Sequence, residues 1–241
     1  MSVDSLLDLS ALTDRADRLV KAARAAGADA ADAVAVRSMS LAIEVRDGNT
    51  EESERAEGDE LGLRVFVGRR QAVVSTNEVT SNEAAAFAER AVAMARATPE
   101  DKFAGLADDR LLTHKFPELD LIDPDLPSVQ KLEAMAQAAE EAGLAVKGVS
   151  KSGGASASAS IGGVVLVTSH GFRGAYLGSN HSVSMTAIAG EGTAMERDYD
   201  YSAVRHAGDL ESPEKIGRGA AQRAIARLNP RKVSTRKVPV A

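Results

Sequence analysis

The feature that most constrains the fold is the order of two hydrophobic periodicities along the chain. A segment with helical spacing is followed by runs of alternating apolar and polar residues, as in Leu61, Leu63 and Val65, and then by a second helical segment. The same order returns in the second half. Strands that are grouped between helices, rather than alternating with them, predict an α+β fold and not a doubly wound parallel sheet. The helical segments cover residues 10–26, 81–97, 128–142 and 212–228.

Glycines and turn residues divide the regions between these helices into short strands. Gly27 and Gly143 are expected to end helices, and Asp47-Gly48 and the Gly190–Gly192 stretch are expected to form hairpin turns. The pattern therefore predicts that each half of the chain forms a helix, an antiparallel meander and a second helix, in mixed α/β layers. The expected strands are 34–36, 41–46, an exposed or edge strand at 50–57, 61–67 and 72–76, and then 145–150, 155–161, 164–169, 174–189 and 193–205.

Prolines divide the chain into domains. Four of the seven prolines fall between Thr98 and Ser128, where they prevent a regular helix. This predicts a first domain over 1–100, a linker over 101–127 and a second domain over 128–232. The apolar residues after 232 resemble the first residues of another strand, so 233–241 is expected to begin a third, truncated domain.

Composition excludes several classes of protein. The chain has no cysteine, which excludes disulfides, thiolate metal sites and a cysteine nucleophile and favours a reducing compartment. Its first residues carry acidic rather than basic side chains, unlike a secretory signal. The most apolar short run, Val164–Val167, is far below the ~20 residues that span a bilayer. We therefore expect a cytoplasmic protein that does not enter the membrane.

The net charge of −6 is unevenly distributed. Residues 210–241 contain eight basic and two acidic residues, whereas the rest of the chain is acidic. A basic segment can indicate nucleic-acid binding, but no aromatic residues interleave with these cations as stacking platforms. Cations also suit the last turn of a helix, where Arg223 and Arg227 would lie. The pattern therefore argues against nucleic acid as a partner.

No complete catalytic motif is present. None of the four histidines (His114, His170, His181 and His206) is followed by glutamate in an HExxH or HExxxH arrangement, which would place two imidazoles and a base on one helical face. Two S-x-x-K matches begin at Ser128 and Ser212. Both serines stand where a helix must begin, so both are expected to be helix caps rather than nucleophiles. The sequence therefore predicts neither catalytic residues nor a metal site in this chain.

A stretch of alternating alanine and serine is a first candidate surface. Ser156, Ser158 and Ser160 would share one face of a strand, with methyl groups on the other face. Such a strand lets another strand or an extended peptide approach closely. The purely structural alternative is a strand packed within its own sheet.

A charged and aromatic strand is the second candidate surface. On a strand, Arg197, Tyr199 and Tyr201 would share one face, and Asp198 and Asp200 the other. Tyrosine and arginine together suit a peptide-binding wall or a subunit interface. The alternative is a structural ladder in which arginine pairs with aspartate across strands.

Several ordered motifs resemble the TldD/PmbA family, and within it the PmbA type, also called TldE. The resemblance spans nearly the whole chain, and its motifs are specific mainly as an ordered set. They are Asp47-Gly48 with Glu51-Glu52, Phe116–Leu121, Thr168–Phe172, Asn180–Ser182, Arg197–Ser202, and Pro230–Lys237 with Pro239.

The resemblance implies a subunit of a zinc metallopeptidase complex that proteolyses small unfolded peptides. In this family the TldD-type subunit holds zinc through an HExxxH helix, which the PmbA type lacks. We therefore expect no cofactor in this chain, zinc in the partner subunit, and either a TldD-type partner or a homodimer. The chain alone is expected to be inactive. The alternative, from the family's older designation as modulator of DNA gyrase, is a regulatory protein acting on gyrase or nucleic acid.

Overall fold

The computed structural model describes residues 8–77, 83–113 and 115–239, so His114, the expected helix start at 81 and the last two residues lie outside the described part. The helices are α2 (Leu9–Ala25), α3 (Ala84–Ala97), α4 (Val129–Leu144) and α5 (Pro213–Ala226), with short 3-10 turns at Asp109–Leu111, Gly192–Ala194 and Ala207–Asp209. The strands are β1 (Ala30–Arg46), β2 (Asn49–Val67), β3 (Arg70–Thr76), β4 (Val149–Thr168), β5 (Arg173–Ala189) and β6 (Glu196–Val204).

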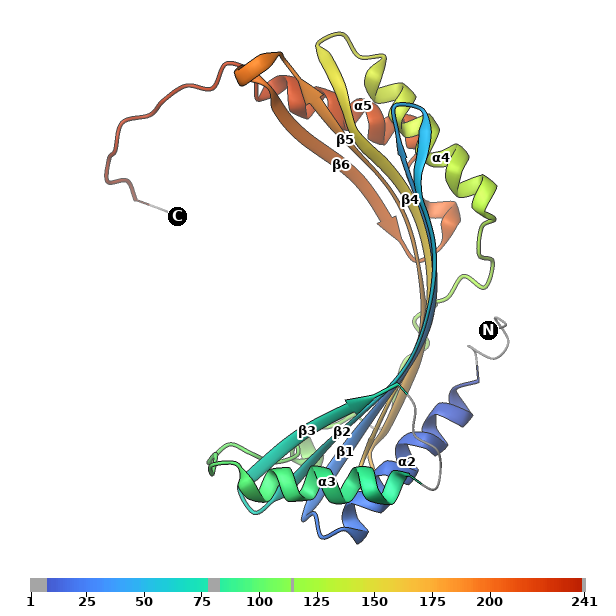
Figure 1. Ribbon diagram of the computed structural model, residues 1–241, viewed down its shortest axis with the longest axis vertical. Helices are drawn as coiled ribbons and strands as arrows, with labels where there is room; N and C mark the ends of the chain where they lie inside the picture. The colour runs from blue at the N-terminus through green and yellow to red at the C-terminus, as the bar shows by residue number, and fades with distance from the viewer. Residues whose placement is uncertain (1–7, 78–82, 114, 240–241) are drawn as a thin grey trace. The chain divides into compact units, whose positions relative to one another are not determined.

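The strands follow one another in the order β3-β2-β1-β4-β5-β6 (Figure 1). Within each half of the chain, strands that are consecutive in sequence are neighbours in the sheet, as a meander requires. The β2–β3 and β5–β6 pairs are antiparallel, with Val65 opposite Ala72 and Val183 opposite Ser202. Each half also begins and ends with a helix. The predicted α+β class and the helix–meander–helix order are confirmed.

The strands are longer than the sequence predicted. We expected breaks near Gly153-Gly154 and Gly162-Gly163, yet β4 runs without interruption for 20 residues. These glycines mark close approach to a neighbouring strand rather than turns. A Cβ at Gly162, for example, would lie 3.1 Å from the main-chain oxygen of Arg37. The polar stretch 50–57 is likewise a full part of the 19-residue β2.

Contacts group the chain into two compact units, each assembled from three separate stretches. Unit 1 comprises Met1–Leu41, Arg55–Leu126 and Ala159–Asn180. In its core, α2 and α3 pack against one face of the strands. Alanines occur on both sides of this contact, for example Ala33 of β1 and Ala91 of α3. The largest core members are Leu12, Leu19, Leu61, Leu63, Val65, Phe87 and Val92.

The proline-rich segment after α3 belongs to unit 1 and has little regular structure, as its prolines predict. Its second half nevertheless packs on the unit. The main-chain oxygen of Leu121 accepts a hydrogen bond from the nitrogen of Ser179 at 2.9 Å. The nitrogen of Asp123 donates to the Ser179 hydroxyl at 2.7 Å. Ile122 and Leu126 pack against a small cluster formed by Met39 and Ile161.

Unit 2 comprises Ala42–Glu54, Pro127–Ser158 and His181–Ala241. Here α4 and α5 pack tightly against each other, because Gly217 brings the two backbones together. A Cβ at Gly217 would lie 2.0 Å from the main-chain oxygen of Ala139. The prediction that Gly143 ends α4 is wrong. The helix continues to Leu144, and a Cβ at Gly143 would lie 2.6 Å from the Met185 side chain, so this glycine serves packing.

A buried glutamate joins α4 to the strands of unit 2. The side chain of Glu140 is 1% exposed and accepts hydrogen bonds from the nitrogens of Asp47 and Gly48 at 3.0 and 2.8 Å. It also accepts a hydrogen bond from the Ser152 hydroxyl. Both turn residues have positive φ, at 51° and 75°, which confirms the predicted Asp47-Gly48 turn.

Two further predictions concern a strand after residue 232 and helices that could cross a membrane. Residues 229–239 have no regular secondary structure, so the strand expected after 232 is not found within them. No helix among the described residues is both long and apolar enough to cross a bilayer.

Candidate functional site

In unit 2, α4 and α5 cover one face of β4, β5 and β6, and none of the helices and strands described for this unit lies on the opposite face, which we call the open face (Figure 1). Alternation along β4 decides which side chains reach it. Ala155 and Ala157 are buried on the helix side, whereas Ser156 and Ser158 are half-buried on the open face. The predicted separation into a methyl face and a hydroxyl face is confirmed.

Hydroxyl groups form two rows across the open face. The Ser156 and Ser184 hydroxyls lie 2.9 Å apart, and those of Ser158 and Ser182 lie 3.3 Å apart. The β5–β6 register extends the first row, because Ser184 lies opposite Tyr201. The structure therefore brings the serine strand and the tyrosine strand together. Ser160 belongs to the part of β4 in unit 1, so it is not part of these rows.

The two tyrosines of β6 are exposed and lie side by side on the open face. Tyr199 is 56% and Tyr201 59% exposed, and their rings stack with centroids 6.2 Å apart at 28°. Arg197 is exposed and alternates onto the same face of the strand. The predicted shared face of these three residues is confirmed. Exposed stacked rings provide a large apolar contact surface with polar hydroxyl tips.

The other face of β6 has a structural role. Arg227, the residue that caps the C-terminal end of α5, forms an ion pair with Asp198 at 2.5 Å. Arg223 of α5 forms an ion pair with Asp200 at 3.0 Å. The hydrogen bond from Arg227 lowers the pKa of the Asp198 carboxyl, and the same bond raises the pKa of the Arg227 guanidinium. The arginine–aspartate ladder considered from the sequence was expected across strands, whereas these pairs link the strand to the α5 region. Their arginines are Arg223 and Arg227, not Arg197.

The aspartates also occupy main-chain groups of this last strand. The Tyr199 nitrogen donates to the Asp198 carboxylate at 2.8 Å, and the Tyr201 nitrogen donates to Asp200 at 3.0 Å. The main-chain oxygen of Tyr199 accepts a hydrogen bond from the Arg223 guanidinium at 3.2 Å. A peptide adding to β6 through main-chain hydrogen bonds would have to displace these contacts. The side-chain surface of the open face, rather than the strand edge, is therefore the accessible site.

Two adjoining hollows on unit 2 form what we call the polar groove. One, of about 160 Å³, is lined by residues of β1, β2, β4 and β5, and the other, of about 420 Å³, lies at β6. Thr186 lines both, so the hollows meet at this residue. The first also contains Glu44, Arg46, Glu51, Gly153, Gly154, Ser156 and Ser184, and the second Arg197, Asp198, Tyr199 and Arg227.

Sequence reasoning missed the β1–β2 side of this groove. Period-2 alternation does place Glu44 and Arg46 on one face of their strand, but it cannot reveal which strand lies beside them. The pairing of β1 with β4 joins residues about 110 positions apart in the sequence. The one local signal was Gly153-Gly154, because glycines within a strand mark a close approach by a neighbour, which at Gly153 is Thr186.

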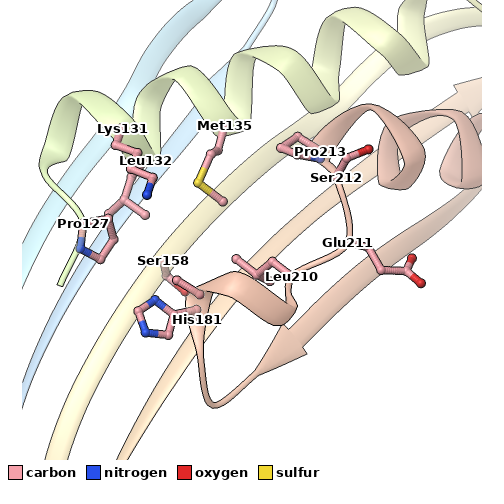
Figure 2. A pocket seen from close by; sticks show the side chains of 11 residues that line it. Pro127, Lys131, Leu132, Met135, Ser158, His181, Leu210, Glu211, Ser212 and Pro213 are labelled. Atoms are coloured by element: carbon pink, nitrogen blue, oxygen red, sulfur yellow. The ribbon is translucent and has the colours of Figure 1, made fainter. Parts of the chain in front are cut away.

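A further pocket, of about 200 Å³, lies where α4 and α5 begin (Figure 2). Its lining includes Ser158, His181, Glu211 and Ser212. Serine, histidine and glutamate are residue types that hydrolases use for catalysis. Their contacts do not fit catalysis. The Ser212 hydroxyl caps α5 by accepting from the Lys215 nitrogen at 3.3 Å. Figure 2 shows the Glu211 carboxylate pointing away from the His181 ring.

The Ser128 and Ser212 hydroxyls both cap helices, as predicted. Among the residues that the structure describes, no group of three or more histidine, aspartate or glutamate side chains could hold a metal ion.

Comparison with known proteins identifies the family. Residues 31–95 match the family model described as PmbA/TldA metallopeptidase domain 1, and residues 122–228 match the PmbA/TldA metallopeptidase central domain. The chain is 35% identical over 205 residues to metalloprotease PmbA of Escherichia coli O157:H7, covering 85% of this chain and 46% of that protein. It is 36% identical over 209 residues to the PmbA homologue of Haemophilus influenzae, covering 86% and 46%.

Solved structures agree with these matches. A candidate modulator of DNA gyrase from Bacteroides thetaiotaomicron superposes with a TM-score of 0.83 at 25% identity, covering 92% of this chain and 51% of that chain. TldE from Thermococcus kodakarensis superposes with a TM-score of 0.70 at 15% identity, covering 88% and 46%, which supports the fold alone. The chain spans about half the length of the curated relatives it matches. By its two family-model matches and its curated relatives, the chain belongs to the PmbA/TldD metallopeptidase family.

Proposed function

We propose that this chain belongs to the non-catalytic, PmbA/TldE-type subunit of a cytoplasmic metallopeptidase complex that degrades small unfolded peptides. In this proposal a TldD-type partner supplies the zinc ion and the catalytic base. The contribution of this chain is to bind the peptide on the open face of unit 2. A homodimer is the alternative assembly.

The observation that carries the proposal is the combination of hydroxyl rows and stacked exposed tyrosines on one uncovered face. Serine hydroxyls both donate and accept, so they can pair with the main-chain N–H and C=O groups of any peptide. Tyr199 and Tyr201 offer apolar contact to side chains of many kinds. Such a surface recognises an extended peptide without reading its sequence, which suits a protein that handles unfolded chains.

The test is the double variant Tyr199→Ala/Tyr201→Ala, purified with the TldD-type partner. We expect peptide turnover to fall about thirtyfold, because each buried aromatic contact in an interface can contribute ~1 kcal/mol or more and the variant removes two of them. The mass of the complex should be unchanged. Tyr176→Ala is the matched control, since Tyr176 is also exposed (55%) but lies on the part of β5 in unit 1.

Other outcomes lead to different conclusions. Loss of the complex in the double variant would make the open face a subunit interface rather than a peptide site. Unchanged turnover together with unchanged mass would reject both roles. Tight DNA binding that weakens steeply with salt would instead favour the regulatory alternative, for which the basic residues after α5 are the natural contact.

A further inference from the structure

The polar groove carries opposite charges at its two ends. At the β1–β2 end, Glu44 and Glu51 outnumber Arg46. At the β6 end, the charged side chain on the open face is Arg197, because Asp198 and Arg227 pair with each other on the opposite face of the strand. The groove is therefore negative at one end and positive at the other.

One residue at each end is available to bind a ligand. Arg46 pairs with Glu51 at 3.3 Å, and Arg227 pairs with Asp198 at 2.5 Å. These pairs leave Glu44 and Arg197, both exposed, and neither has an ion-pair partner among the residues that the structure describes. A charged ligand group can therefore bind at each end without breaking an existing pair.

The floor between the two ends is polar and free of bulky side chains. It contains the Ser156–Ser184 hydroxyl pair, Thr186 and the bare backbone at Gly153. A Cβ at Gly153 would lie 2.7 Å from the Thr186 methyl group, so any other residue here would crowd the floor. A backbone amide can lie on this floor and exchange hydrogen bonds with the hydroxyls.

The length of the groove restricts the size of its ligand. From β1 to β6 the groove crosses three strand spacings, through β4 and β5. At about 4.8 Å per spacing this is about 14 Å across the strands. Arg197 is also displaced along the strands, because it lies opposite Ile188, four residues beyond the Ser184 that pairs with Ser156. The diagonal from Glu44 to Arg197 is therefore about 19 Å, which an extended peptide covers with about six residues.

We propose that the polar groove binds short peptides of about six residues in one direction, with the terminal ammonium at Glu44 and the terminal carboxylate at Arg197. The inference rests on the proposed peptide-binding role and adds a selection for free termini. It assigns the groove to peptides that have already been cut to a short length.

The test uses one sequence, hexa-alanine, in three forms: with both termini free, with an acetylated amino end, and with an amidated carboxyl end. Binding to the isotope-labelled chain is measured by NMR titration. We expect each cap to weaken binding about fivefold, the upper range for a solvent-exposed ion pair. Arg197→Gln should abolish the effect of the amide cap only, and Glu44→Gln the effect of the acetyl cap only.

Arg218→Gln is the matched control, because Arg218 is exposed on α5, which covers the opposite face. Equal binding of all three peptide forms to the unaltered chain would overturn the inference. So would an Arg197→Gln variant that binds all three forms equally more weakly. If binding is independent of the caps but depends on Tyr199 and Tyr201, the proposed function stands and only the terminal selection fails. If no form binds, peptide binding at this face is itself refuted.

Discussion

Replacing Glu140 by glutamine is a sharp test of how unit 2 is held together. The carboxylate accepts three hydrogen bonds, from the Asp47 and Gly48 nitrogens and the Ser152 hydroxyl. A glutamine amide offers one acceptor oxygen, and its NH₂ group must face at least one of these donors. The variant therefore loses at least one charge-assisted hydrogen bond and leaves a buried donor facing another donor.

The expected cost follows from these contacts. A hydrogen bond to a charged group contributes ~1.5–3 kcal/mol, and a buried donor without an acceptor costs ~1–3 kcal/mol. Allowing for partial relaxation, we expect Glu140→Gln to lower the free energy of unfolding by about 2–4 kcal/mol. Against a typical total of ~5–15 kcal/mol, that loss is large. Because Glu140 holds the β1–β2 turn, hydrogen exchange at Asp47 and Gly48 should also accelerate.

The assay is urea denaturation followed by circular dichroism, with Glu141→Gln as the matched control. Glu141 is the next residue of α4 and is exposed, so its replacement should change the free energy of unfolding by no more than ~0.5 kcal/mol. The reasoning is refuted if the two variants unfold at the same urea concentration with the same slope. A Glu140→Gln variant more stable than the original chain would show that burying the charge costs more than its three bonds return.

Two further predictions concern α5. Gly217→Ala should destabilise unit 2 by about 2–4 kcal/mol in the same assay, since the methyl group would collide with the main-chain oxygen of Ala139. Gly208→Ala, whose methyl would meet no atom within 4 Å, should change stability far less, and equal effects would contradict the backbone-contact argument. The pKa of Asp198 is lowered in the folded chain because Arg227 donates a hydrogen bond to its carboxylate. Its contribution to stability is therefore complete at a pH above the pKa of the unfolded chain, and it is lost as the pH falls through the lower pKa of the folded chain. Thermal unfolding measured from about pH 7 to pH 2 should therefore show a smaller loss of melting temperature in acid for Asp198→Asn, and an identical pH profile would reject the role of this pair.

The sequence predicted what depends on local periodicity. Helical spacing located all four helices, and alternation correctly assigned Ser156 and Tyr199 to outward faces because side chains on a strand alternate whatever the strand's neighbours are. Glycine was ambiguous. Gly27 ends a helix with φ of 96°, whereas Gly143 lies within one and makes room for Met185. A single sequence does not separate a glycine needed for its backbone angle from one needed for its small size.

The site itself depended on information that periodicity lacks. Glu44 and Ser156 contribute to one groove only because β1 lies beside β4, and that pairing is set by long-range packing. The role of Asp198 was undetermined for the same reason. The alternative considered was an arginine on a neighbouring strand, but the partner is Arg227, which directly follows α5 on the helix side of the sheet.

The distribution of polar groups on unit 2 bears on how selectivity could arise in a peptide-binding subunit. A deep pocket for a particular side chain would make affinity depend on sequence, whereas the open face offers hydroxyls and flat rings that suit any main chain. The strand edge at Tyr199 and Tyr201 is already hydrogen-bonded to aspartates, which disfavours long segments joining the sheet. What can still differ between ligands is the position of their charged ends relative to Glu44 and Arg197. In our proposal, length and free termini rather than sequence therefore decide which peptides bind.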